Sequence, residues 1–151
     1  MEAVPAGISE QKKAAREKIG FMGHPMVLAR HPTTIEITTE SHLTKRGDCI
    51  IGVGSDRGCA GLSQETKASL IRDGARVRLR FVVGEQSFVV KARGDSRLTL
   101  THPHDIVVRR SSFVSDRTLA VGADAAAKDI PKSMVEALSR GACGFLEIEV
   151  T

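Results

Sequence analysis

The sequence predicts a strand-rich α+β fold with two helical segments and a mixed or antiparallel sheet. A partly closed barrel is one arrangement that such a sheet could take. Three patterns lead to this prediction: short runs of alternating apolar and polar residues, two adjacent runs joined by Gly84-Glu85, and two segments with helical spacing. The chain has 151 residues, 41% hydrophobic and 26% charged, which suits one globular domain. We expect residues 1–17 to form a flexible or weakly helical extension and residues 18–151 to form a single α+β domain.

Alternation along the chain defines the candidate strands. They are Lys18–His24, Met26–Arg30, Thr33–Thr39, Asp48–Gly54, Arg76–Val83, Gln86–Arg93, Leu98–Thr101, Asp105–Ser112 and Phe145–Val150. The run Asp48–Gly54 is apolar on both faces, so we expect it in the centre of a sheet. A turn is expected at Lys45-Arg46-Gly47, and no internal repeat is recognised in the sequence.

The two helical segments have recognisable boundaries. Ser63 is a typical N-cap for the first helix, and Gly74 ends it. The second segment, Ala123–Arg140, has an apolar face and is followed by Gly141. Pro131 lacks an N–H group, so we expect the second helix to break or restart there.

Charge, cysteine content and aromatic content exclude several classes of protein. The formal net charge is +4, no apolar run approaches the length of a membrane helix, and the N-terminus lacks an apolar signal segment. We therefore expect a cytoplasmic protein without membrane association. Cys49, Cys59 and Cys143 form no metal-binding pair, so they are interpreted as structural thiols. No cofactor is expected, and the lack of Trp and Tyr argues against a site built from several stacked aromatics.

The hairpin formed by Arg76–Val83 and Gln86–Arg93 is the clearest candidate interface. A two-residue turn would place five cations on one face: Arg76, Arg78, Arg80, Lys91 and Arg93. Like charges opposite one another cost some tenths of a kcal/mol per pair. RNA phosphates or a phosphorylated small molecule would offset this cost. The alternatives are a neighbouring acidic strand, for which Glu147 and Glu149 have the right spacing, and plain solvation of the cations.

Polar residues also gather near the first strands. His24, His31 and Glu36 are candidate catalytic residues, because two imidazoles and a carboxylate suit either general acid–base chemistry or a metal site. The alternative is a hydrogen-bonded sheet edge with two ordinary histidines. His102-Pro103-His104 has a metal-like spacing, but Pro103 favours a loop or an edge.

A second candidate site lies between Asp105 and Thr118, where hydroxyl and guanidinium groups that suit an oxyanion are concentrated. The expected ligand-binding residues of this segment are Arg109, Arg110, Ser111, Arg117 and Thr118, and Thr34 of the first polar segment is also expected to bind the ligand. The alternative is a capped connection in which Asp116 pairs with an arginine. The glycine-rich loop Gly52–Gly61 lacks Gly-Lys-Ser/Thr, so a phosphate-binding loop of that type is rejected.

Two stretches resemble a known family: Gly23–Val53, GHPMVLARHPTTIEITTESHLTKRGDCIIGV, and Asp105–Ile130, DIVVRRSSFVSDRTLAVGADAAAKDI. They resemble the archaeal domain-of-unknown-function family numbered three hundred and seventy-one, over most of the chain from about residue 18. The resemblance implies a small archaeal cytoplasmic protein and no particular chemistry. It marks His24, His31, Thr34, Glu36, Asp48, Arg109, Ser111, Arg117 and Thr118 as matching polar positions. Ala125 stands where the family pattern often has Lys.

Two functions of different classes follow from these patterns, and whether the protein is an enzyme stays open. The first is a module that binds RNA or a phosphate-bearing ligand through the basic hairpin and the Asp105–Thr118 segment. The second is a small-molecule hydrolase in which His24 or His31 acts as the base, Glu36 orients it, and a metal ion assists in one version. A homo-oligomer is compatible with either function.

Overall fold

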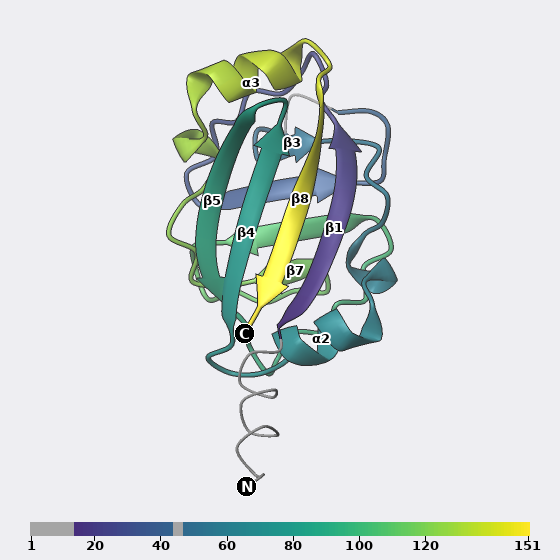
Figure 1. Ribbon diagram of the computed structural model, residues 1–151, viewed down its shortest axis with the longest axis vertical. Coiled ribbons are helices and arrows are strands. Elements are labelled where there is room, and N and C mark those ends of the chain that lie inside the picture. The colour runs from purple at the N-terminus through teal and green to yellow at the C-terminus, as the bar shows by residue number, and fades with distance from the viewer. Residues whose placement is uncertain (1–13, 44–46) are drawn as a thin grey trace, which may run out of the picture.

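The computed structural model describes residues 14–43 and 47–151, and in these residues eight strands form two four-stranded sheets (Figure 1). Sheet A has the order β1 (Ala15–Met22), β8 (Cys143–Val150), β4 (Arg76–Val83) and β5 (Gln86–Arg93), all antiparallel. Sheet B has the order β3 (Ile50–Gly52), β2 (Thr34–Thr38), β6 (Asp105–Arg109) and β7 (Thr118–Ala120). The α+β prediction is therefore confirmed, with two sheets instead of a closed barrel.

The two sheets pack face to face, and the strands of sheet B run across those of sheet A (Figure 1). Alternate residues of both sheets fill the space between them, among them Ile19, Leu79 and Ile148 from sheet A and Ile35 and Ile106 from sheet B. Two short helices, α2 (Gln64–Leu70) and α3 (Lys132–Ser139), lie at opposite ends of the molecule (Figure 1). Within the described residues, no helix is both long and apolar enough to cross a membrane.

The fold consists of two similar halves related by an approximate two-fold axis. In the first half β1, β2, β3, a 3₁₀ turn at Cys59–Gly61, α2 and β4 follow in order; β5, β6, β7, a 3₁₀ turn at Ala127–Asp129, α3 and β8 repeat that order. Each sheet order is symmetric under this exchange, and the parallel pairs β2–β3 and β6–β7 correspond. The chain therefore contains an internal structural repeat, which the search for sequence patterns missed.

Matching turns show that the repeat extends to single hydrogen bonds. Gly54 and Gly122 both adopt positive φ angles, 57° and 61°, and each is followed two residues later by an aspartate. The Asp56 carboxylate accepts from the Gly20 N–H of β1 at 2.7 Å, and that of Asp124 accepts from the Lys91 N–H of β5 at 3.0 Å. The two aspartates thus connect the edge strands of sheet A, β1 and β5, to the loops that follow β3 and β7.

Several predicted elements are confirmed. The hairpin has the expected register, with Arg78 opposite Lys91 and Val83 opposite Gln86. Ser63 caps α2 by accepting from the Thr66 N–H at 3.1 Å. A helix begins at Pro131 as expected, since Pro131 is the N-cap of α3, but residues 123–130 contain only the 3₁₀ turn Ala127–Asp129 in place of the expected first helical part.

Other predicted elements differ from the structure. Met26–Arg30 and Leu98–Thr101 are not strands, because Ala29 and Leu100 each adopt a φ of 52°, which extended backbone does not allow. β3 lies at the edge of sheet B and not in its centre; Ile51 is nevertheless fully buried, which explains the apolar run. β7 was not expected at all.

The boundary of the domain lies earlier than residue 18. β1 begins at Ala15, so residues 15–17, assigned above to the extension, belong to sheet A. The rest of the predicted extension up to residue 13, and Lys45 and Arg46 of the predicted turn, lie outside the described residues.

Candidate functional site

The outer face of sheet B, turned away from sheet A, carries the densest group of polar side chains. Ile35, Ile37, Ile106 and Val108 point into the core, so the alternate residues of β2 and β6 point outward. Polar side chains among them are nevertheless buried, with Glu36 8% and Asp105 9% exposed. A cleft of about 460 Å³ opens there, lined by His31, Thr33, Thr34, Glu36, Cys49, Val107, Arg109, Phe113, Ser115 and Arg117. This volume lies in the range typical of small-molecule sites.

A second cavity of about 330 Å³ adjoins this cleft and shares Glu36, Cys49 and Arg117 with it. The two-fold repeat accounts for the pair. Cys49 precedes Ile50, which pairs with Glu36, and Arg117 precedes Thr118, which pairs with Val107, so Cys49 and Arg117 occupy equivalent positions. The shared residues therefore lie near the axis, and each half of the chain contributes a wall to both cavities.

Glu36 lies at the centre of the cleft, on β2. Its Oε1 accepts from the Cys49 thiol at 3.4 Å. The pKa of Glu36 is raised from its ordinary value of 4.5 to about 7. Burial is the main cause, and the nearby charge of Asp105 is the second. Glu36 therefore exchanges a proton near neutral pH, which an exposed glutamate does not.

Arg109, on β6, forms one cationic wall of the cleft. Its Nε donates to the Thr118 hydroxyl at 2.9 Å and one terminal nitrogen donates to the Ser115 hydroxyl at 3.2 Å. Its guanidinium carbon lies 4.9 Å from the centre of the Phe113 ring. Burial lowers the pKa of Arg109 and Glu36 opposes that change, but a guanidinium keeps its proton in either case.

Arg117 supplies a second cation, which is held by an acidic partner. Its Nη1 lies 2.7 Å from Asp105 Oδ2, and a nitrogen of the same guanidinium lies 3.4 Å from His102 Nε2. Asp105 is buried at the start of β6, so the pair fixes the direction of Arg117. The guanidinium is thereby oriented before any ligand arrives.

His31 serves as a hydrogen-bond donor in this geometry. Its Nδ1 accepts from the backbone N–H groups of Thr33 and Thr34, both at 3.2 Å. A neutral imidazole that accepts at Nδ1 carries its proton on Nε2, so Nε2–H is the group available to a ligand. The hydrolase hypothesis, in which Glu36 orients His31 as a base, does not match, because Glu36 bonds Cys49 and backbone amides orient His31.

The structure brings together part of the predicted set of site residues. Five of the predicted residues line the cleft: His31, Thr34, Glu36, Arg109 and Arg117. Thr118 is fully buried and accepts a hydrogen bond from Arg109. Arg110 and Ser111 do not line it.

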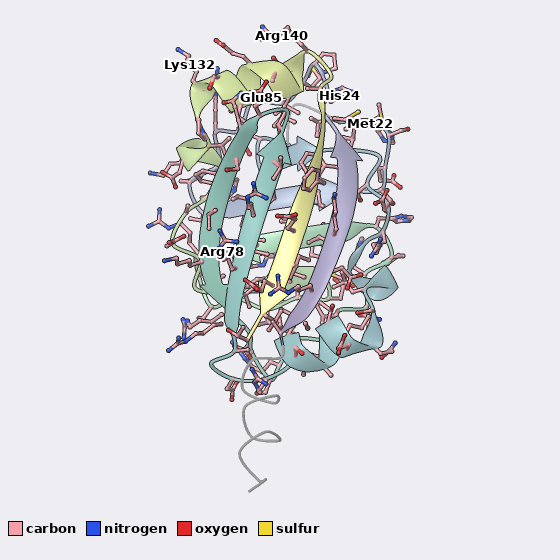
Figure 2. The ribbon with its side chains drawn as sticks, viewed as in Figure 1. Met22, His24, Arg78, Glu85, Lys132 and Arg140 are labelled. Atoms are coloured by element: carbon pink, nitrogen blue, oxygen red, sulfur yellow. The ribbon has the colours of Figure 1, made fainter. Side chains whose placement is uncertain are left out.

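His24 lies elsewhere. Its Nδ1 accepts from the Met26 N–H at 3.0 Å, and it lies beside Met22 near the α3 end of the molecule (Figure 2). Five lining residues were not among the predicted site residues: Thr33, Cys49, Val107, Phe113 and Ser115. Only the approach of the loop after β6 to β2 and β3 brings them together, and no sequence spacing expresses that approach.

Metal coordination gains no support from the described ranges 14–43 and 47–151, where no three His, Cys, Asp or Glu side chains are grouped to hold an ion. The rings of His102 and His104 lie 6.2 Å apart at 71°. His102 Nδ1 accepts from backbone amides, and His104 Nδ1 bonds the Thr39 hydroxyl at 2.6 Å. This matches the loop interpretation of His102-Pro103-His104.

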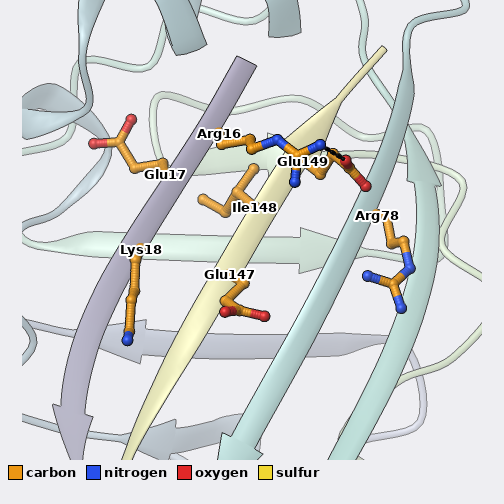
Figure 3. A pocket seen from close by; sticks show the side chains of 7 residues that line it. All are labelled: Arg16, Glu17, Lys18, Arg78, Glu147, Ile148 and Glu149. Atoms are coloured by element: carbon orange, nitrogen blue, oxygen red, sulfur yellow. Dashed lines mark ion pairs between the residues drawn. The ribbon is translucent and has the colours of Figure 1, made fainter. Parts of the chain in front are cut away.

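The five hairpin cations alternate with buried residues along β4 and β5, so they belong to the outer face of sheet A, where Figure 2 labels Arg78. That face also holds carboxylates. β8 lies between β1 and β4 and places Glu147 and Glu149 among the cations. Arg80 pairs with Glu147 at 2.7 Å, and Arg16 pairs with Glu149 at 2.8 Å. A hollow of about 290 Å³ lies on this face, and Figure 3 shows the side chains that line it: Arg16, Glu17, Lys18, Arg78, Glu147, Ile148 and Glu149. The neighbouring acidic strand thus offsets part of the repulsion, and the hairpin does not require an external anion.

The comparisons with known proteins give a family and no activity. The sequence matches the family described as "Domain of unknown function (DUF371)" over residues 19–151. It is also similar to "Uncharacterized protein MJ0206" of Methanocaldococcus jannaschii, with 38% identity over 119 residues, covering 79% of this chain and 87% of the relative.

Proposed function

Since the chain belongs to the family described as "Domain of unknown function (DUF371)", whose description states no activity, we propose from the cleft itself that the protein binds a small phosphate-bearing ligand there. One observation carries the proposal. Two guanidinium groups, from Arg109 and Arg117, converge on a cleft whose central carboxyl, Glu36, is protonated up to about pH 7. A cleft of this kind accepts an anion without strong repulsion from its own acidic group.

The donors suit a group with several oxygens. Guanidinium groups offer paired N–H donors that match phosphate oxygens. Arg109 approaches the cleft from β6, and Arg117 approaches it from the turn before β7. His31 adds an Nε2–H donor and Ser115 adds a hydroxyl. A tetrahedral phosphate can accept from all of these groups, whereas a single carboxylate has fewer acceptor positions.

Hydrolysis is a second candidate, which the pKa of Glu36 favours. In its ionised form Glu36 would accept a proton from a water that attacks the phosphorus, and it would return that proton to the departing oxygen. Cys49 is a poor nucleophile, because burial raises its pKa to about 12. Binding is the primary proposal because no activated nucleophile is found among the described residues that line the cleft.

Isothermal titration of the full chain with ribose 5-phosphate and with inorganic phosphate tests the proposal. We expect saturable binding of both that weakens as salt is added. Arg109→Gln and Arg117→Gln should each lower the affinity by about tenfold, since each removes a charge-assisted contact. Arg78→Gln is the matched control, because Arg78 is an exposed arginine of sheet A outside the cleft.

The outcomes separate the alternatives. Absence of binding by both probes at low salt contradicts the proposal. If Arg78→Gln weakens binding as much as Arg117→Gln, the anion binds to the hairpin face, and the same variants tested with an RNA stem-loop then measure RNA binding there. Release of phosphate from ribose 5-phosphate that is lost in Glu36→Gln supports the hydrolase candidate.

A further inference from the structure

Phe113 stands apart from the other four phenylalanines of the chain. Its side chain is 60% exposed, whereas Phe21 and Phe81 are buried in the core and Phe88 and Phe145 are half-buried. It belongs to the loop after β6 and lines the cleft described above. An exposed aromatic ring at the mouth of a cleft leaves apolar surface in water that a ligand could cover.

The ring is held close to the anion-binding groups. The Arg109 guanidinium carbon lies 4.9 Å from the ring centre, so one cation contacts both the ring and the interior of the cleft. The Phe113 N–H donates to the Ser111 hydroxyl at 3.3 Å, which fixes the backbone at this point of the loop. The guanidinium occupies one part of the ring surface, and the large exposed fraction leaves the rest accessible.

From this arrangement we propose that the ligand is a nucleoside monophosphate, whose base stacks on Phe113 while its phosphate contacts Arg109 and Arg117. The inference rests on the proposed function and adds the class of ligand. The aromatic ring of Phe113 and the guanidinium of Arg109 lie side by side, so a ligand with a flat base and a phosphate close together can contact both. Stacking on an aromatic side chain depends little on which base is present, so base identity is read weakly or not at all.

Titration of the full chain with adenosine 5′-monophosphate and with ribose 5-phosphate tests this inference. Both carry the same sugar phosphate, and only the first carries a base. We expect adenosine 5′-monophosphate to bind about tenfold or more tightly. Phe113→Leu, which keeps apolar bulk and removes the aromatic ring, should abolish this difference, so that the variant binds adenosine 5′-monophosphate no more tightly than ribose 5-phosphate. Phe113→Tyr should keep the difference.

The two proposals fail in different ways. Equal affinity of the wild-type protein for the two compounds overturns the nucleotide inference and leaves the phosphate site in place. A tenfold difference that persists in Phe113→Leu also overturns it, because the base then binds elsewhere. Absence of binding by both compounds overturns the phosphate site and the nucleotide inference together. Because Phe113 is exposed, thermal melts should show that its variants fold like the wild type.

Discussion

Glu36 and Val107 face one another across the β2–β6 pair, and they also occupy equivalent positions in the two halves of the chain. The approximate two-fold axis therefore passes between a carboxyl and an isopropyl group. Two carboxyls at this point would repel one another across the strand pair. The cleft is therefore asymmetric: its acidic group, Glu36, comes from the first half, and both of its arginines, Arg109 and Arg117, come from the second half.

The raised pKa of Glu36 predicts a pH-dependent stability. Below about pH 4.5 the carboxyl is protonated in both the folded and the unfolded chain, and its burial costs little. Between about pH 4.5 and 7 the unfolded chain loses this proton first, so the free energy of unfolding falls as the pH rises. The loss amounts to at most about 3 kcal/mol. Glu36→Gln should be more stable than the wild type near pH 8, as measured by urea denaturation.

The control for this prediction is Glu85→Gln, in the exposed turn of the β4–β5 hairpin. This change should shift the stability curve little between about pH 4 and 8. If Glu36→Gln and the wild type lose stability in parallel over that range, Glu36 does not titrate as described.

Anion binding should weaken as Glu36 ionises. Sulfate is the suitable probe, because a phosphate monoester itself changes charge near pH 6. We expect the affinity for sulfate to fall several-fold between about pH 6 and 8, since a carboxylate then stands beside the anion. The Glu36→Gln variant should show a flatter pH profile by isothermal titration. An unchanged slope in that variant would assign the effect to a different group.

The Arg117–Asp105 pair should be energetically coupled. Arg117→Met leaves a buried carboxylate without its closest cation and should lower stability by roughly 2 kcal/mol. The double variant Arg117→Met with Asp105→Asn should recover part of this loss, and a double-mutant cycle measures the coupling. The Arg97–Asp95 pair, which lies on the surface, is the matched control and should show a weaker coupling. Additive losses in the first cycle would mean that Asp105 does not hold Arg117.

Alkylation of the three cysteines tests the environment of Cys49. Burial raises the pKa of both Cys49 and Cys59 to about 12, whereas Cys143 is exposed at the start of β8. Because the thiolate is the reactive form, iodoacetamide should modify Cys143 first, as followed by peptide mass spectrometry. Glu36→Gln removes a charge that also raises the pKa of Cys49 and should speed its modification. Modification of Cys49 as fast as Cys143 in the wild type would contradict this description.

Local patterns in the sequence predicted the elements whose contacts are local. The β4–β5 hairpin register follows from a two-residue turn, and the start of α2 follows from the Ser63 cap. The same reasoning failed at Met26–Arg30 and Leu98–Thr101, where a single residue with positive φ interrupts an apolar run. A positive φ angle cannot be predicted from the sequence pattern when the residue is not glycine.

The cleft was harder to predict, because its walls come from distant parts of the chain. Glu36 and Arg109 were recognised as polar residues on strands, but the antiparallel pairing of β2 with β6 is what places them in one cleft. The hydrolase hypothesis named His31 or His24 as the base, and the sequence does not reveal that two backbone amides donate to His31 Nδ1. Phe113 carried no signal at all, since an isolated Phe in a loop is ordinary in a sequence.

The order of sheet A is unchanged when the two halves of the chain are exchanged, so the same fold could be formed by a chain that begins with the second half. Val150 pairs with Ala15 just as Val83 pairs with Gln86, so β1 begins beside the end of β8, at the position that the symmetry relates to the Gly84-Glu85 turn. A circularly permuted chain, opened at Gly84 and closed by a linker between Thr151 and Ala15, should adopt the same arrangement and keep its anion affinity.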